Sequence, residues 1–174
     1  MHLSVIQKLS VYIVPLILAI TMHEIAHAFV AKKRGDNTAQ MLGRLSLNPI
    51  HHIDLIGTIL FPLLGLLLGG VIFGWAKPVP INYRNLHNPK QDLFFVSLAG
   101  PFSNLIMALL WALILKVSYY FNNYFGVPLN LMSQAGVSIN ISLMILNLLP
   151  ILPLDGGRML YAVLPERYAK KYSE

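Results

Sequence analysis

Two histidines and a glutamate in the pentapeptide HEIAH have the residue types and spacing of a metal site with a base beside it. They are His23, Glu24 and His27, and they lie inside the apolar stretch VPLILAITMHEIAHAFVAKK. Residues i and i+4 of a helix share a face, so the two histidines can bind one ion while Glu24 reaches a metal-activated water as general base. Because ionisable groups are costly inside an apolar membrane helix, a chance match is less expected here than in a soluble chain.

A third ligand is needed, because catalytic zinc sites usually combine three protein ligands with one open position. The chain has no cysteine, which leaves nitrogen and oxygen donors. Among the other histidines and carboxylates we favour Asp155, in NLLPILPLDGGR at residues 147–158, because prolines and glycines there interrupt a helix and let a carboxylate turn inward. Taken alone, the Asp-Gly-Gly sequence is equally well explained as a helix end at the membrane surface.

Two asparagines in apolar stretches are further candidates. Asn147 precedes Asp155 by eight residues and is placed to hydrogen-bond a substrate backbone or a developing oxyanion. A hydrogen bond between helices explains Asn147 equally well. Asn104, in AGPFSN at residues 99–104, is interpreted first as a bond between helices and second as part of the site.

The sequence NPIHHIDLIGT, residues 48–58, is dense in polar groups just before an apolar run. His52 and Asp54 could orient a metal ligand or form an accessory site. The alternative is a capped entry into the next segment, which we favour slightly.

The composition is that of an integral membrane protein. Of the 174 residues, 56% are hydrophobic and 11% charged, whereas soluble domains are about a quarter charged. The net charge is +6, but the basic residues fall in short connectors between apolar runs, so they indicate topology and not nucleic-acid binding. We expect one domain over residues 1–174, no signal peptide, and no nucleic-acid partner.

Four apolar stretches are long enough to cross a bilayer, at about 9–31, 55–75, 93–117 and 131–154. The connectors 32–54 and 76–92 and the tail after Asp155 are basic, whereas 118–130 is aromatic and lacks Lys and Arg. The positive-inside rule therefore predicts that the basic segments are cytoplasmic and that 118–130 is external.

The second stretch has basic segments on both sides, so it should enter and leave the membrane on one side. Its proline and glycines favour a re-entrant hairpin, although its length favours a full crossing. With a hairpin, His23, His27 and Asp155 share the cytoplasmic half of the membrane. The following GWAKPVPINY is expected to be an extended strand or loop at the interface.

Together these residues resemble the site-2 protease family of intramembrane zinc metalloproteases, in its compact prokaryotic branch. The matching motifs occur in the family's order and span most of the chain: HEIAH, NPIHHIDLIGT, GWAKPVP, AGPFSN and NLLPILPLDGGR. The resemblance implies Zn²⁺ bound by His23, His27 and Asp155, water activation by Glu24, and Asn147 near the substrate backbone.

The fold that the resemblance and the stretches together predict is an all-α membrane protein. It has a three-helix transmembrane core, a re-entrant hairpin or fourth helix over residues 55–75, and a short membrane-associated β segment at GWAKPVP. The resemblance implies that members of this branch usually continue past the LDG motif through a further apolar segment. This chain instead ends in the polar LPERYAKKYSE, as a truncated or naturally short form would.

The expected function is hydrolysis of a peptide bond in or near the transmembrane segment of a membrane-protein substrate, within a prokaryotic cell membrane. Two other classes remain alternatives: a divalent-metal transporter, and an inactive chaperone or scaffold that retains a zinc site. Transport would require polar groups through the whole depth of the membrane, whereas an inactive scaffold would not need Glu24.

Overall fold

The computed structural model describes residues 4–67 and 75–173. Its helical elements, in chain order, are α1 (Val5–Lys33), α2 (Thr38–Met41), η1 (Pro49–His51), the π-helix η2 (Leu55–Leu60), α3 (Phe61–Leu67), η3 (Tyr83–Asn85), α4 (Pro89–Ser118), α5 (Asn123–Asn147), α6 (Asp155–Val163) and α7 (Glu166–Ser173).

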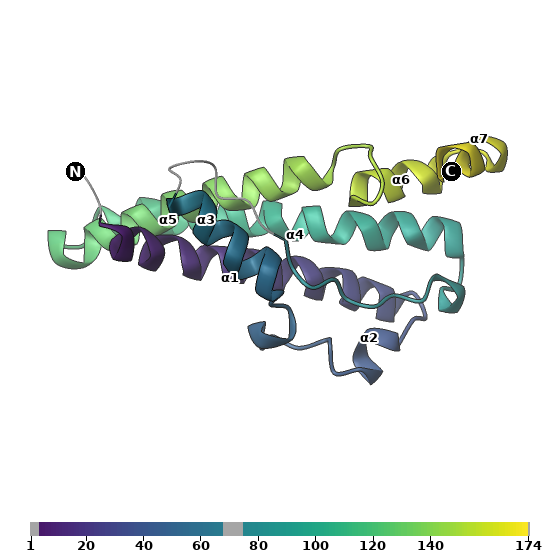
Figure 1. Ribbon diagram of the computed structural model, residues 1–174, viewed down its shortest axis with the longest axis horizontal. Helices are drawn as coiled ribbons and strands as arrows, with labels where there is room; N and C mark the ends of the chain where they lie inside the picture. Colours follow the sequence, from purple (N-terminus) through teal and green to yellow (C-terminus); the bar gives the residue numbers. More distant parts are fainter. Residues whose placement is uncertain (1–3, 68–74, 174) are drawn as a thin grey trace.

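Three long helices form the core of the molecule. The membrane-spanning candidates are Leu9–Lys33 in α1, Pro89–Ser118 in α4 and Tyr124–Asn147 in α5, each apolar and long enough to cross a bilayer. They lie side by side along the long axis, with α1 and α5 running in one direction and α4 in the other (Figure 1). The chain is therefore an integral membrane protein with an all-α core, as predicted.

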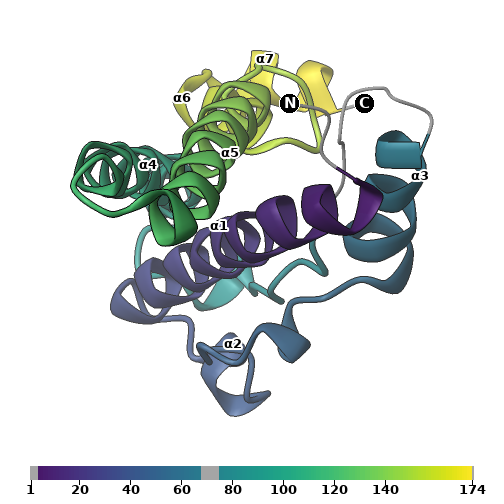
Figure 2. The same ribbon diagram turned by 90° about the vertical axis from the view of Figure 1, so that its left-hand side faces the viewer.

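Helix α1 separates two parts of the molecule. On one side it packs against α4 and α5, and α6 packs on α4. On the other side lie α2, α3 and the extended chain that leads to α4 (Figure 2). Side chains on different faces of α1 therefore meet different partners.

The connector between α4 and α5 is shorter than the aromatic segment 118–130. Helix α5 already begins at Asn123, because the Asn122 side chain caps it by accepting a hydrogen bond from the Phe125 amide. Pro128 lies in the second turn of this helix. The exposed aromatic residues Tyr119, Tyr120 and Tyr124 remain at this end of the bundle.

The predicted hairpin over residues 55–75 is described only in part, since 68–74 lie outside the described residues. The described helical part, Leu55–Leu67, is shorter than the roughly 20 residues that cross the hydrocarbon core. At the far end, the Trp75 amide donates to the Gly57 carbonyl (3.1 Å), and the Thr58 hydroxyl donates to the Trp75 carbonyl (2.8 Å). The chain thus returns to the place where the segment began, as a re-entrant hairpin requires.

The predicted β segment at GWAKPVP is wrong. Residues 75–82 run as extended chain, and the described part of the protein contains no strand with which they could pair. Pro78 and Pro80 have no N–H to give to a ladder. The amides of Lys77 and Val79 donate elsewhere, to the His52 carbonyl and the Glu24 carboxylate.

Candidate metal centre and cleft

The side chains of His23, His27 and Asp155 meet in the interior of the molecule. Asp155 Oδ2 lies 3.2 Å from Nε2 of His23 and 3.2 Å from Nε2 of His27. The two Nε2 atoms are 3.0 Å apart. All three residues are buried, so two residues on α1 and the first residue of α6 form one compact group.

The opposite nitrogen of each imidazole is held by an acceptor. His23 Nδ1 lies 2.6 Å from Oδ1 of Asn104, and His27 Nδ1 lies 2.7 Å from the carbonyl oxygen of Val96, both on α4. An acceptor at Nδ1 places the proton on that nitrogen and leaves a lone pair on Nε2. Both lone pairs are then directed at Asp155, the arrangement that a metal requires of histidine ligands.

The donor set fits zinc in number, type and spacing. Nitrogen and oxygen ligands about 2.0–2.1 Å from a tetrahedral zinc are about 3.3 Å apart, close to the 3.0 and 3.2 Å separations found here. Asp155 Oδ2 is buried, and no residue that the structure describes gives it a hydrogen bond. Three converging atoms with lone pairs repel one another unless a cation lies between them.

Glycines make room for this group. A Cβ atom on Gly100 of α4 would lie 2.3 Å from His27 Nε2, so only glycine lets α4 pass beneath the imidazoles. A Cβ on Gly156 would lie 2.3 Å from the Leu148 carbonyl oxygen, and one on Gly157 would lie 2.5 Å from the Ile151 carbonyl carbon. Because both glycines follow Asp155 directly, they let α6 start close to the end of α5.

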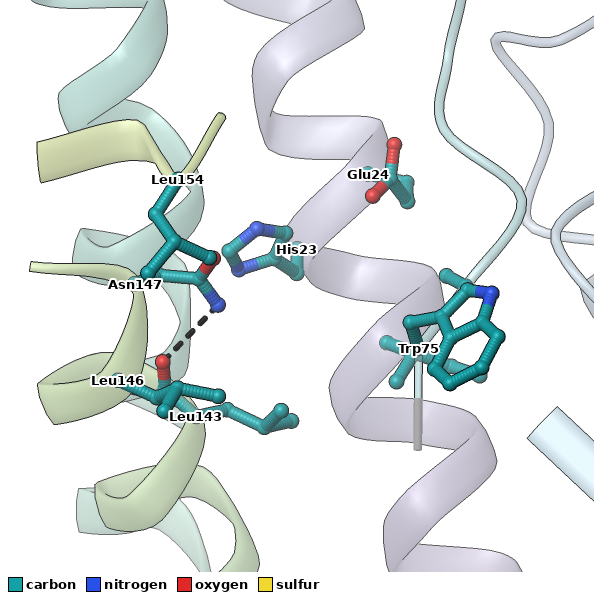
Figure 3. A pocket seen from close by; sticks show the side chains of 9 residues that line it. His23, Glu24, Trp75, Leu143, Leu146, Asn147 and Leu154 are labelled. Atoms are coloured by element: carbon teal, nitrogen blue, oxygen red, sulfur yellow. Dashed lines mark hydrogen bonds between the residues drawn. The ribbon is translucent and has the colours of Figure 1, made fainter. Parts of the chain in front are cut away.

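The side chains of Glu24 and His23 point from different faces of α1. Figure 3 shows His23 directed toward α5 and Glu24 directed toward the side on which Trp75 lies. A cavity of about 160 Å³ between these elements is lined by His23, Glu24 and Asn147 together with apolar residues: Ile20, Trp75, Ala76, Leu143, Leu146 and Leu154. One possible metal ligand, a possible base and an amide thus border one mostly apolar cleft.

Three further residues predicted from the sequence, Asn147, His52 and Asp54, have hydrogen-bond partners other than the ligand candidates. Asn147 lines the cleft and donates to the Leu143 carbonyl of its own helix (3.0 Å). His52 is buried, and its Nε2 lies 2.9 Å from the Ser46 carbonyl oxygen. Asp54 caps η2 through the amides of Ile56 and Gly57. In the described part of the chain, the side-chain hydrogen bonds of His52 and Asp54 are therefore within their own loop and not with the three ligand candidates.

One residue of the centre was not found from the sequence. Asn140 on α5 is fully buried, and its Oδ1 accepts a hydrogen bond from Nδ2 of Asn104 (2.9 Å) while its own Nδ2 donates to the Gly136 carbonyl (2.8 Å). A chain of contacts thus runs from α5 through Asn104 to His23. The available signal was a second asparagine seven residues before Asn147, on the same face of an apolar helix.

Comparison with known proteins agrees with the geometry. The family model described as "Peptidase family M50" matches residues 124–174. The chain is 39% identical over 166 residues to "Putative zinc metalloprotease YwhC" of Bacillus subtilis, a match that covers 93% of this chain and 73% of the relative. No solved structure matches the chain.

More distant relatives carry similar names. "Putative zinc metalloprotease Rip2" of Mycolicibacterium smegmatis is 30% identical, over 80% of this chain and 52% of the relative. "Zinc metalloprotease MJ0392" of Methanocaldococcus jannaschii is 27% identical, over 91% of this chain and 36% of the relative. The chain thus spans about half or less of the length of these two relatives, but most of the Bacillus protein. It belongs to peptidase family M50, the site-2 protease family of intramembrane zinc metalloproteases.

Proposed function

We propose that this protein hydrolyses a peptide bond in or near the transmembrane segment of a membrane-protein substrate, with zinc held by His23, His27 and Asp155. The observation that carries the proposal is the meeting of three buried ligand atoms beside a cleft that Glu24 also lines. Zinc supplies Lewis acidity at such a site, which acidifies water and polarises a carbonyl. Family membership favours this activity over the metal transport considered above.

The chain's own residues account for the proton transfers. Glu24 takes a proton from the attacking water, whose oxygen forms a bond to the scissile carbonyl carbon. Glu24 then gives that proton to the leaving nitrogen as the C–N bond breaks. One water is consumed, and a carboxylic acid and an amine are formed.

The cleft is suited to an unwound apolar segment. Its walls are mostly apolar, as a transmembrane substrate requires, and Asn147 offers a side-chain amide at the edge. A helical peptide bond is shielded by its own hydrogen bonds, so the substrate must unwind before it reaches Glu24. We propose that Asn147 hydrogen-bonds the unwound backbone or the oxyanion that develops on it.

Glu24→Gln tests the catalytic step. We expect purified protein in detergent to keep its zinc, because Glu24 is not among the three ligands, and to lose cleavage of a model transmembrane substrate. Glu166→Gln is the matched control, since Glu166 is an exposed carboxylate on α7. Unchanged cleavage by Glu24→Gln would rule out the proposed mechanism.

Asp155→Ala tests the third ligand. We expect it to reduce bound zinc well below one ion per chain, measured by elemental analysis after gel filtration. Zinc retained at full stoichiometry would contradict the assignment of Asp155, whatever the effect on cleavage.

The orientation is also a proposal. Basic residues lie at the ends of helices near Asp155: Lys33 at the end of α1, Lys90 at the start of α4, Arg158 in α6 and Lys170 in α7. The opposite end of the bundle, where α1 and α5 begin and α4 ends (Figure 1), has the aromatic residues and the two lysines Lys8 and Lys116. Lys33 lies six positions after His27, or about 9 Å along α1. We therefore place the site in the cytoplasmic half of a prokaryotic cell membrane.

The lack of cysteine makes this orientation testable. In intact cells, Tyr124→Cys should react with a membrane-impermeant maleimide, and Lys33→Cys should react only after lysis. The opposite labelling pattern would overturn the orientation.

A further inference from the structure

The catalytic-base candidate Glu24 has a backbone partner from a segment remote in sequence. The amide of Val79 donates to Oε2 of Glu24 at 2.7 Å. The Val79 side chain is buried and packs with Ala28 and Ala39. Ala28 lies one helical turn after Glu24 on the same face of α1. Val79 therefore contacts this face twice, with its side chain at Ala28 and with its N–H at Glu24.

The extended segment is held in register by alternate amides. Trp75 donates to the Gly57 carbonyl (3.1 Å), Lys77 to the His52 carbonyl (3.0 Å), and Val79 to Glu24 (2.7 Å). Successive residues of an extended chain point to opposite sides, so these three amides face the same way. Two anchors on the 52–57 loop thus determine which amide meets Glu24.

The loop that provides these anchors is itself fixed. Asp54 accepts hydrogen bonds from the amides of Ile56 and Gly57, and its own amide donates to the Thr58 hydroxyl. The same hydroxyl donates to the Trp75 carbonyl. This network shows what the polar residues Asp54 and Thr58 of NPIHHIDLIGT do: they join the loop to the extended segment, and their described hydrogen bonds do not include the three ligand candidates.

The Arg44 side chain also holds the extended segment in place. The Arg44 guanidinium donates through Nη2 to the carbonyl oxygens of Lys77 (3.0 Å) and Pro78 (3.3 Å). Pro78 and Pro80 flank Val79, and their rings fix the backbone φ on both sides. The Val79 amide is thereby presented to Glu24 by a stiff, anchored piece of chain.

We propose that the backbone amide of Val79 is a positioning group for the catalytic base. This inference rests on the proposed function. By occupying Oε2, the amide fixes the rotamer of Glu24 and leaves Oε1 to take the proton from water. A base misplaced by about 1 Å costs on the order of 100-fold in rate, so a fixed rotamer matters for kcat. Because the amide contacts none of the three ligand candidates, it should not matter for zinc affinity.

The test compares two substitutions that both remove the valine side chain. Val79→Pro lacks the N–H, whereas Val79→Ala keeps it. We expect kcat of Val79→Pro to be about 10- to 100-fold below kcat of Val79→Ala on the same model transmembrane substrate. The KM and the zinc dissociation constant should agree between the two variants.

Arg44→Ala gives a second test that leaves the backbone intact, in case Val79→Pro does not fold. It removes the Arg44 hydrogen bonds to the extended segment, and we expect a several-fold lower kcat with unchanged zinc affinity. Arg84→Ala is the matched control, since Arg84 is an exposed arginine in the same connector. Equal kcat in Arg44→Ala and Arg84→Ala would overturn the proposal.

Two further outcomes would also overturn it. One is equal kcat in Val79→Pro and Val79→Ala, and the other is a parallel loss of zinc affinity in Val79→Pro, which would indicate a general structural role. Failure here is distinguishable from failure of the proposed function. If Glu24→Gln still cleaves, the function fails; if Glu24→Gln is inactive and Val79→Pro matches Val79→Ala, only the positioning role fails.

Discussion

The Asn104 side chain holds the metal-ligand candidate His23 from a neighbouring helix, with Oδ1 of Asn104 2.6 Å from Nδ1 of His23. Both side chains are buried. The contact fixes the orientation of the ring and places the Nδ1 proton, so that Nε2 is free to bind a metal.

Replacing Asn104 with leucine should therefore weaken zinc binding. Loss of a hydrogen bond that orients a ligand typically costs 10- to 100-fold in metal affinity, and we expect this range for Asn104→Leu in competition with a fluorescent chelator. Ser133→Ala is the control, since Ser133 is equally buried but bonds only the Leu129 carbonyl of its own helix in the described contacts. Equal affinities for the two variants would contradict the role of Asn104.

Asn140 should act on zinc only through Asn104. Asn140→Leu removes the nearer of two acceptors for Asn104 Nδ2 (2.9 Å to Asn140, 3.4 Å to the Ala19 carbonyl) but leaves the contact with His23, so we expect a smaller loss of zinc affinity than for Asn104→Leu. Residues in one network are not additive. The double variant should bind zinc about as weakly as Asn104→Leu alone, and additive losses would show that the two asparagines act independently.

Gly100→Ala should disrupt metal binding by pushing a methyl group against both imidazole rings. The added Cβ would lie 2.3 Å from His27 Nε2 and 2.6 Å from His23 Cε1. We expect the variant to lose stoichiometric zinc, measured by elemental analysis, and to lose cleavage with it. Ser103→Ala, three residues further along α4, should retain zinc because the Ser103 hydroxyl bonds only the Gly100 carbonyl in the described contacts. Full zinc content in Gly100→Ala would mean that α4 can move away at low cost.

Asp36 should make the stability of the connector region depend on pH. Burial acts to raise its pKa, but hydrogen bonds from Thr38, Asn85 and the Asn82 amide outweigh burial and lower the pKa from its ordinary value of 3.8. A lowered pKa in the folded state contributes stability at neutral pH, and this contribution is lost as the pH falls below about 4 toward the folded-state pKa.

Asp36→Asn tests this contribution. The variant places an NH₂ group among donors, which costs about 1–3 kcal/mol at neutral pH. The difference in melting temperature between the wild type and the variant should shrink as the pH falls from 5 to 3, because protonation of Asp36 in the unfolded state removes the contribution of its charge to stability. A constant difference over that range would show that the charge of Asp36 does not contribute to stability.

Much of the candidate site follows from local sequence. The i, i+4 spacing puts His23 and His27 on one helix face in any structure where residues 14–33 are helical. Long hydrophobic runs predict the three helices that are apolar and long enough to cross a bilayer. The break at the LDG sequence marks Asp155 as a residue beyond the end of the long helix α5, at the start of the short helix α6.

Other features depend on contacts that no local pattern encodes. The expected β segment failed because strand formation needs a partner, and the amides of Lys77 and Val79 are bonded instead to His52 and Glu24. The roles of Asn140 and Gly100 depend on how α4 and α5 pack around α1, because the sequence around each residue does not show which side chain of another helix it will contact.

The sequence by itself thus determined the class of protein, the chemistry of its ligands and the helices that carry them, because residue type, hydrophobicity and helical period act locally. Only the tertiary structure decided that Asp155 meets both histidines, that Asn104 orients one of them, and that the Val79 amide lies on Glu24. These are contacts between segments far apart in the chain. Their partners are fixed by the packing of the three long helices and by where the intervening loops return to them.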